Sequence, residues 1–305
     1  MAIPSFQELM LPLLRVAADQ AEYRISGVIE MLADQFRLTA EEKNERLPSG
    51  ADRLFDNRAR WARFYLGKAG CLDSTGRGRF CITERGLDVV KENIVEVDLK
   101  FLGRFPEFAA FYHGSRGIGE QGMFVKGDDG EVSQTPEEAL EASYQSLRSA
   151  LQQELLDRVK QCSSAFFERL VVDLLVAMGY GGSRKDAGQA VGRTGDDGID
   201  GIIKEDRLGL DTVCIQAKKW DGSVGRPVVQ AFAGSLEGHR ARKGVLITTS
   251  QFTSDAKEYV NRIERRIVLI DGEQLVQLMI DHGIGVTDAA RYEVKKADAD
   301  YFEAE

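Results

Sequence analysis

Apolar residues in the first third of the chain recur at spacings of three and four, the period of an amphipathic helix. Residues 5–19 and 24–36 each carry one such stripe. Their predicted inward-facing residues are Phe6, Leu9, Met10, Leu13, Leu14, Ala17, Ile25, Val28, Ile29, Leu32 and Phe36. Residues 54–70 continue the pattern and end on Gly70, a residue type that often follows the last turn of a helix. We therefore predict three helices that share one core.

The third of these stretches carries both apolar and basic side chains. Its predicted core side consists of Leu54, Trp61, Phe64, Tyr65 and Leu66. Its predicted exposed side consists of Arg58, Arg60, Arg63 and Lys68. Residues 71–83 then indicate two short strands around a glycine-rich turn that holds Arg77 and Arg79. Residues 84–93 indicate a fourth helix.

Three helices followed by a basic hairpin are typical of a winged-helix DNA-binding domain. In that arrangement the third helix enters the major groove and the hairpin, called the wing, contacts phosphates. An arginine-rich helix can also be no more than a solvated face, but here the helix and the hairpin are both basic and adjacent. We predict DNA contacts by Arg58, Arg60, Arg63, Lys68, Arg77 and Arg79.

The middle of the chain has a different character. Residues 103–135 lack periodicity and are rich in Gly, Asp and Ser, which indicates a linker or an irregular surface segment. A helix is predicted over residues 136–160, where Thr135, Pro136 and Glu137 supply a cap, a proline and an acid in the expected order. This helix could be a spacer or part of a dimer interface. We therefore predict four segments: the winged-helix domain at 1–95, a linker and connecting helix at 96–160, a carboxyl-terminal domain at 161–290 and a tail at 291–305.

The carboxyl-terminal part alternates helices and strands. Helices are predicted over 163–182, 225–241 and 254–263, and strands over 197–206, 208–220 and 243–250, with a last strand and helix within 266–283. The strand at 243–250 is an apolar run, as expected for a strand buried on both faces. This order predicts an α/β core with a mixed sheet.

Composition and charge narrow the class of protein. The 305 residues carry a formal net charge of −9, yet the stretch from Arg53 to Arg85 holds eight basic and three acidic residues, so a basic patch is compatible with the acidic total. The four cysteines are far apart and the three histidines are isolated, which argues against disulfides, zinc and a histidine-rich metal site. No signal peptide or membrane-spanning run is visible. We therefore expect a cytoplasmic protein.

Two polar features interrupt the predicted sheet. Asp200 stands in "GRTGDDGIDG", at the start of a strand, although Asp and Gly are poor strand residues. On the next strand Gln216 and Lys218 alternate with apolar residues, so both should point to one face. A carboxylate can hold a hard divalent cation, which polarises a phosphodiester and activates water, while a lysine stabilises the developing charge. The pattern indicates phosphodiester hydrolysis.

The extended series of motifs resembles the Mrr family of type IV restriction endonucleases, within the PD-(D/E)XK nuclease superfamily. The resemblance is carried by "GRTGDDGIDG", "LGLDTVCIQAKKW", "SVGRPVVQAF" and "ITTSQFTSDA", which lie within residues 160–285. It implies a restriction-endonuclease-like mixed-sheet core behind the winged-helix domain. It assigns metal binding to Asp200 and Gln216, and adds Lys218, Glu168 and, less firmly, Gln230 as catalytic residues.

The resemblance also implies a substrate and a cofactor. The expected activity is Mg²⁺-dependent cleavage of foreign double-stranded DNA that carries methylated adenine or cytosine, with Mn²⁺ as a second candidate metal. Because one active site cuts one strand, we expect a homodimer or a higher even oligomer. Two alternatives stay open: a DNA repair or Holliday-junction nuclease, and a DNA-binding regulator with a vestigial nuclease core.

Overall fold

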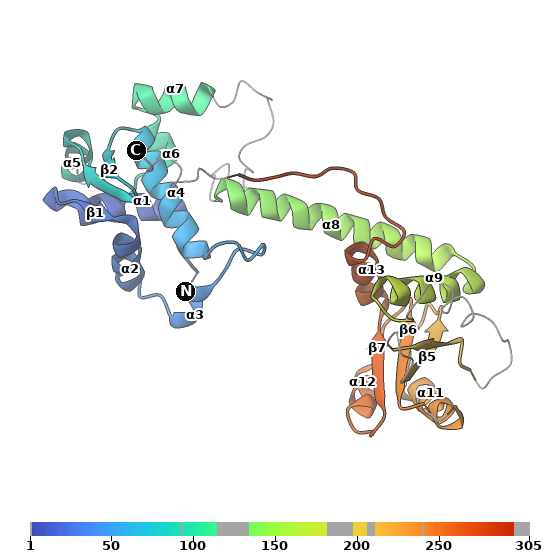
Figure 1. The fold of residues 1–305 in the computed structure, drawn as a ribbon. Coiled ribbons are helices and arrows are strands. Elements are labelled where there is room, and N and C mark those ends of the chain that lie inside the picture. Colours follow the sequence, from blue (N-terminus) through green and yellow to red (C-terminus); the bar gives the residue numbers. More distant parts are fainter. Residues whose placement is uncertain are drawn as a thin grey trace, which may run out of the picture. The chain divides into compact units, whose positions relative to one another are not determined.

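A computed structural model of the chain describes residues 2–92, 94–114, 134–181, 198–205, 211–239 and 241–295. It divides into two compact units, one formed by residues 1–146 with 295–305 and the other by residues 147–294. Helix α8 (Pro136–Gln161) contributes residues to both. Figure 1 shows the elements of each unit.

The amino-terminal unit is mainly helical and has a small sheet. Its helices are α1 (Phe6–Val16), α2 (Ile25–Gln35), α3 (Ala40–Asn44), α4 (Leu54–Lys68), α5 (Glu84–Lys91), α6 (Leu99–Leu102) and α7 (Pro106–Gly114), with one 3₁₀ turn at Ala17–Asp19. Strands β2 (Leu72–Gly76) and β3 (Arg79–Ile82) form an antiparallel hairpin, and β1 (Tyr23–Arg24) pairs with β3, giving the strand order β1-β3-β2. The predicted helices at 5–19, 24–36 and 54–70 and the hairpin are therefore present.

The core of this unit forms where the first stripe predicted it. The six apolar residues predicted to face inward from the first stretch are all fully buried. Ser5 and Glu8 form a capping box that satisfies backbone N–H groups at the start of α1. The core face predicted for α4 is wrong in part, because its central buried residues are Phe55, Ala59 and Ala62. Phe64 is instead 40% exposed and Trp61 is half-buried.

The expectation of irregular structure from residue 103 onward is also corrected. Residues 106–114 form α7, whose Phe108 is buried against Tyr65, with ring centroids 6.1 Å apart. The spacing of Phe108, Phe111 and Tyr112 is that of a helix. It was missed because the glycines that follow indicated an irregular segment. Residues 115–133 lie outside the described part of the chain.

A polar network ties α4 to the start of α8. Arg58 was expected to be exposed, but its guanidinium donates to Glu138 at 2.8 Å and to the carbonyl oxygen of Ile3 at 2.6 Å. The two charged side chains are only 16% and 8% exposed. The hydroxyl of Thr135 donates to Oδ1 of Asn57 at 2.7 Å beside them. Arg58 is therefore a structural residue, and we leave it out of the candidate DNA contacts.

Removing one partner of this buried pair should destabilise the unit. Glu138→Ala leaves the Arg58 guanidinium without its counter-charge, and we expect the free energy of unfolding to fall by about 3–5 kcal/mol. Glu154→Ala is the matched control on the same helix, because Glu154 pairs with Arg158 at an exposed i,i+4 position. That loss should be about 0.5 kcal/mol or less. Urea denaturation of both variants measures the difference, and equal losses would contradict the importance of the buried pair.

The carboxyl-terminal unit is the mixed α/β structure that the sequence predicts. Strands β4 (Gly201–Lys204), β5 (Thr212–Lys218), β6 (Lys243–Thr248) and β7 (Arg266–Ile270) form one sheet in that order. β4 is antiparallel to β5, and β5, β6 and β7 are parallel to one another. The helices are α9 (Ser164–Ala177), α11 (Arg226–Gly238), α12 (Ser254–Val260) and α13 (Gly272–Asp281), together with the end of α8.

Two apolar layers enclose this sheet. On one face, Ile215 of β5 packs in a cluster with residues of α9 and α13. On the other, Cys214 packs with Phe232 of α11 and Ala256 of α12. Figure 1 shows α11 and α12 on the side of the sheet away from α9 and α13. Both faces of the central strands β5 and β6 are therefore covered, and β5 becomes partly exposed only at its end, at Lys218.

Two further observations concern the chain as a whole. All four cysteines are free thiols, in agreement with their wide spacing. Within the described ranges, no helix is both long and apolar enough to cross a membrane.

Candidate active site

The pairing of β4 with β5 places Asp200 at the end of the sheet. Gly201 is opposite Ile215, and the N–H of Asp200 donates to the carbonyl oxygen of Ile215 at 2.9 Å. Asp200 therefore stands opposite Gln216 and shares its face. Its carboxylate oxygen Oδ2 accepts a hydrogen bond from the backbone N–H of Ala217 at 2.7 Å. A backbone donor thus fixes the carboxylate over the last residues of β5.

Gln216 is polar and yet buried next to Asp200. Its side chain is only 5% exposed, and its amide nitrogen donates to the carbonyl oxygen of Gly198. Its Oε1 atom is buried and finds no hydrogen-bond partner among the described residues. A buried acceptor without a donor is costly, so the position calls for a positively polarised partner.

The close approach of Gly198 depends on its lack of a side chain. Its φ is +82°, in the region that favours glycine, and a Cβ at this position would lie 2.9 Å from Nε2 of Gln216. This glycine therefore belongs to the architecture that orients the Gln216 amide. Gly192, Asp196 and Asp197, from the same glycine-rich run, lie outside the described residues.

Lys218 and Glu168 complete a charged group around Asp200. Lys218 ends β5 on the same face as Gln216 and is partly exposed. Burial raises the pKa of the Glu168 carboxyl, the negative charge of Asp200 raises this pKa further, and the positive charge of Lys218 opposes both. The two acids and the lysine are thus close enough to influence one another, although Glu168 comes from α9.

The fifth residue predicted for this site is less closely connected. Gln230 is exposed on α11, and among the described residues no hydrogen bond joins it to the others. No cluster of three His, Cys, Asp or Glu side chains arranged for metal binding occurs in the described ranges. Among the described residues, β4 and β5 bring together two kinds of side-chain oxygen here: the Asp200 carboxylate and the neutral Oε1 of Gln216.

A feature that the sequence interpretation missed lies next to Lys218. Residues 248–250 do not cap the following helix, because the N-cap of α12 is Thr253. The buried hydroxyl of Thr249 instead accepts from the N–H of Trp220 at 3.0 Å and donates to its carbonyl oxygen at 2.9 Å. Trp220 itself is 43% exposed. Thr249 therefore fixes the chain that leaves β5 beyond Lys218.

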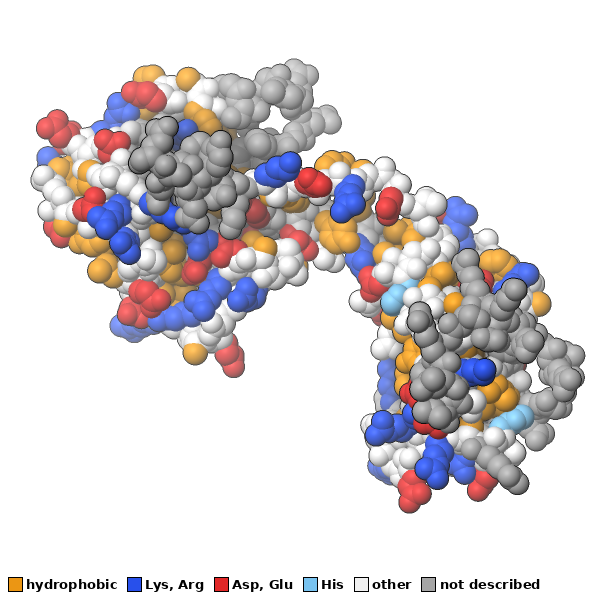
Figure 2. Space-filling model, in the orientation of Figure 1, with side chains coloured by type: hydrophobic (Ala, Val, Ile, Leu, Met, Phe, Trp, Pro, Cys, Tyr) orange, Lys and Arg blue, Asp and Glu red, His pale blue; other side chains and the backbone are white. Residues whose placement is uncertain are grey.

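The predicted DNA contacts of the amino-terminal unit lie on α4 and the hairpin. Arg60 forms an ion pair with Asp52, and Arg79 pairs with Glu22 at 2.8 Å. Arg63 lies over the ring of Phe80 at 5.2 Å, and Lys68 lies over the ring of Phe64 at 5.4 Å. Figure 2 shows acidic side chains interspersed among the basic ones on the face of this unit that it presents.

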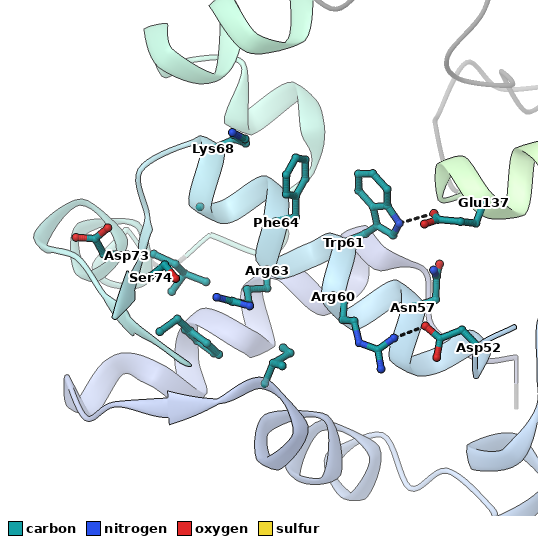
Figure 3. Close-up of a pocket in the computed structure, with 14 residues that line it drawn as sticks. Asp52, Asn57, Arg60, Trp61, Arg63, Phe64, Lys68, Asp73, Ser74 and Glu137 are labelled. Carbon is teal, nitrogen blue, oxygen red and sulfur yellow. Dashed lines mark hydrogen bonds and ion pairs between the residues drawn. The ribbon is translucent and has the colours of Figure 1, made fainter. Parts of the chain in front are cut away.

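A groove of about 680 Å³ runs along the outward side of α4, and we call it the α4 groove. Its lining residues are Ile25, Asp52, Asn57, Arg60, Trp61, Arg63, Phe64, Gly67, Lys68, Leu72, Asp73, Ser74, Phe80 and Glu137. Figure 3 shows Trp61 directed toward Glu137 and Arg60 directed toward Asp52. The groove therefore combines aromatic, acidic and basic side chains.

Comparison with known proteins agrees with this architecture. A family model described as a restriction endonuclease matches residues 159–279, and one described as the Mrr N-terminal domain matches residues 6–92. The chain is 37% identical over 308 residues to the type IV methyl-directed restriction enzyme EcoKMrr of Escherichia coli strain K12. That alignment covers 99% of this chain and 100% of the enzyme.

Two solved structures also match, at low TM-scores. The MspJI restriction endonuclease in complex with a 27-mer oligonucleotide is 25% identical, with a TM-score of 0.32, over 44% of this chain and 31% of that one. The restriction endonuclease FokI is 13% identical, with a TM-score of 0.30, over 91% of this chain and 70% of that one. TM-scores this low add no support to a family assignment.

The carboxyl-terminal unit is thus a restriction endonuclease, a hydrolase that cleaves DNA. The chain as a whole belongs to the Mrr family of type IV restriction endonucleases.

Proposed function

We propose that this protein cleaves methylated double-stranded DNA in a reaction that requires Mg²⁺ and takes place at Asp200 and the residues around it. The observation that carries the proposal is the buried Oε1 of Gln216, next to the carboxylate of Asp200, for which the described residues supply no hydrogen-bond donor. Oxygen donors are the ligands that Mg²⁺ prefers. The relative from Escherichia coli is a methyl-directed enzyme, and this supports the choice of substrate.

The residues divide the chemical work. Asp200 and Gln216 would hold the cation, and Mn²⁺ would suit the same oxygens. When bound, the metal supplies Lewis-acid activation of the phosphate and of the attacking water. Lys218 stabilises negative charge that develops on the phosphate. Glu168 faces the same charged group, and we propose it as a further catalytic residue, with Gln230 at the edge of the site.

The amino-terminal unit is proposed to bind the DNA as a winged-helix domain. The order α1, β1, α2, the short helix α3, α4 and then the β2–β3 hairpin supports this assignment. The proposed contacts are Arg60, Arg63, Lys68, Arg77 and Arg79. Several of these side chains already have partners inside the protein, so binding exchanges some internal ion pairs for contacts with phosphate.

The wing arginines should set part of the salt dependence of DNA binding. Each phosphate that is neutralised contributes a slope of about −0.9 in log K against log salt. Replacing Arg77 and Arg79 by Ala should therefore flatten the slope by about one to two units. The matched control replaces Lys43 and Lys91, which removes the same charge from helices outside the hairpin. A slope that changes equally in both variants would remove the wing from the interface.

Cleavage of both strands calls for two active sites. We propose that the protein acts as a homodimer or a higher even oligomer, at least on DNA. Analytical ultracentrifugation with a bound methylated duplex should give an even number of chains for each complex. A monomer that cuts both strands in one binding event would contradict this proposal.

The proposed function is tested by incubating the purified protein with methylated and unmethylated copies of one plasmid, with and without Mg²⁺. Cleavage should require both the methylation and the metal. Equal cleavage of both plasmids would remove the methyl-directed part of the proposal. Preferential cutting of a branched four-way junction would instead favour the Holliday-junction alternative, and binding without any cutting would favour a regulator.

A further inference from the structure

The α4 groove differs from a surface built only to hold phosphates. Glu137 and Asp52 place carboxylates in it beside the basic residues Arg60, Arg63 and Lys68, and Trp61 and Phe64 give it an aromatic wall. Carboxylates repel phosphate, whereas aromatic faces stack on nucleobases and carboxylates accept from exocyclic amino groups. The aromatic wall and the Glu137 carboxylate therefore match a base, and the basic side chains of the groove can hold the phosphates next to that base.

The aromatic side chains of the groove are held in fixed positions. The indole nitrogen Nε1 of Trp61 donates to the Glu137 carboxylate at 2.6 Å. The rings of Trp61 and Phe64 meet edge to face at 5.2 Å, and Phe64 meets Phe111 of α7 at 5.7 Å. Lys68 lies 5.3 Å from the centre of the Phe111 ring, on the same aromatic cluster. The exposed part of Phe64 is thus a rigid apolar surface, not a loose side chain.

Polar groups of both kinds stand beside this surface. Asn57 is 6% exposed, and its Oδ1 is occupied by the hydroxyl of Thr135, so the group it can offer to a ligand is its amide donor. Glu137 offers a carboxylate acceptor from the first turn of α8. A donor and an acceptor next to an aromatic wall are the elements that read the edge of a base.

The shape of the groove decides how a base can reach it. The lining comes from α4, from the hairpin, from the start of α2 and from the first turn of α8, so a ligand in the groove would meet side chains from several elements. A volume of about 680 Å³ is of the size that accepts a small molecule, and a duplex is too wide to enter it. A base has to leave the stack to occupy such a groove.

We propose that the α4 groove binds a methylated adenine or cytosine that has been extruded from the duplex, with its methyl group against Phe64 and Trp61. The inference rests on the proposed function, because it names how that function recognises its substrate. Glu137 accepts from the exocyclic amino group, and Asn57 donates to the base. The methyl group adds apolar surface that the aromatic wall buries. This burial is the source of the preference for a methylated over an unmethylated base.

Phe64→Ala tests the groove in the full-length chain. DNA binding is measured by fluorescence anisotropy in the Asp200→Asn background, so that cleavage does not interfere. The duplexes are identical except for one N6-methyladenine or one 5-methylcytosine. With Phe64 intact, we expect the protein to bind a methylated duplex about tenfold or more tightly than the unmethylated one. Phe64→Ala should weaken binding of that duplex by about 5- to 150-fold and leave the unmethylated duplex within about twofold.

The matched control is Phe166→Ala, because Phe166 of α9 is 45% exposed, close to the 40% of Phe64. This variant should keep the full preference. A thermal melt of each variant shows whether the fold is retained, and Phe64→Leu supplies a smaller change at the same position. A preference that survives both Phe64 substitutions overturns the inference and leaves the proposed function standing. If the protein with Phe64 intact shows no preference for methylated DNA, the methyl-directed function is removed and the inference fails with it.

Extrusion is tested with the same chains and one altered duplex. Extruding a base costs less when it has no pairing partner. Placing an abasic site opposite the methylated base should therefore tighten binding, and Phe64→Ala should lose this gain. Equal or weaker binding of the abasic duplex means that the base is read inside the helix, which overturns the proposal.

Discussion

Asp200→Asn is expected to reduce cleavage of methylated DNA by several orders of magnitude while DNA binding stays unchanged. The substitution removes one negative charge and keeps nearly the same shape. The Asn oxygen can still accept from the N–H of Ala217, the bond that positions the carboxylate, so the local structure should survive. What is lost is the charged ligand, and with it the activation of the phosphate and of water.

The control for Asp200→Asn lies at the other end of the same strand pair. Asp211 precedes β5 and forms an ion pair with Lys243 at 2.9 Å. Asp211→Asn removes the same charge from the same unit, far along the strand from Lys218. Single-turnover cleavage of one methylated oligonucleotide should separate the two variants. If both variants cut at the normal rate, the metal-site interpretation of Asp200 is wrong.

Lys218→Ala is expected to lower the cleavage rate by about 10²–10³-fold or more, because it removes a preorganised charge next to the phosphate. Lys219→Ala provides a close control, since Lys219 is the next residue and β5 ends at Lys218. The rate of Lys219→Ala should stay within a few fold of the parent. The same single-turnover assay measures both, and equal losses would show that the two lysines contribute only general positive charge.

The centre of the nuclease unit could be predicted from the sequence because its signals are local. Gln216 and Lys218 share a face through the two-residue period of a strand, and the register of β4 against β5 brings Asp200 opposite Gln216. Glu168 was added only by the resemblance. Its electrostatic link to Asp200 depends on how α9 packs against the sheet, which periodicity does not report.

The parts that were wrong depended on small residues and on distant partners. Helix α4 contains two possible apolar stripes, and the buried one is built on Ala59 and Ala62 in place of Trp61 and Phe64. Large side chains dominate a hydrophobicity pattern, although alanines let helices approach closely. The Arg58–Glu138 pair joins residues 80 positions apart, so nothing near Arg58 in the sequence indicates that its charge is buried.

The unexplained Oε1 atom of Gln216 illustrates what the structure adds. A sequence pattern names the residue but gives no information about which of its atoms are satisfied. The hydrogen bond from Nε2 to Gly198 fixes the orientation of the amide and leaves Oε1 buried beside Asp200. Gly198 of the glycine-rich run thus orients the Gln216 amide, and this orientation leaves its Oε1 next to the Asp200 carboxylate.

The central claim is that Asp200 and Gln216 hold the metal on which cleavage depends, and metal binding tests it most directly. Isothermal titration of Mg²⁺ into the full-length protein, bound to uncleavable methylated DNA, should give a binding signal in the wild type and in Lys218→Ala, because lysine is not a ligand. The signal should be lost or greatly weakened in Asp200→Asn and kept in Asp211→Asn. Unchanged Mg²⁺ affinity in Asp200→Asn would contradict the account.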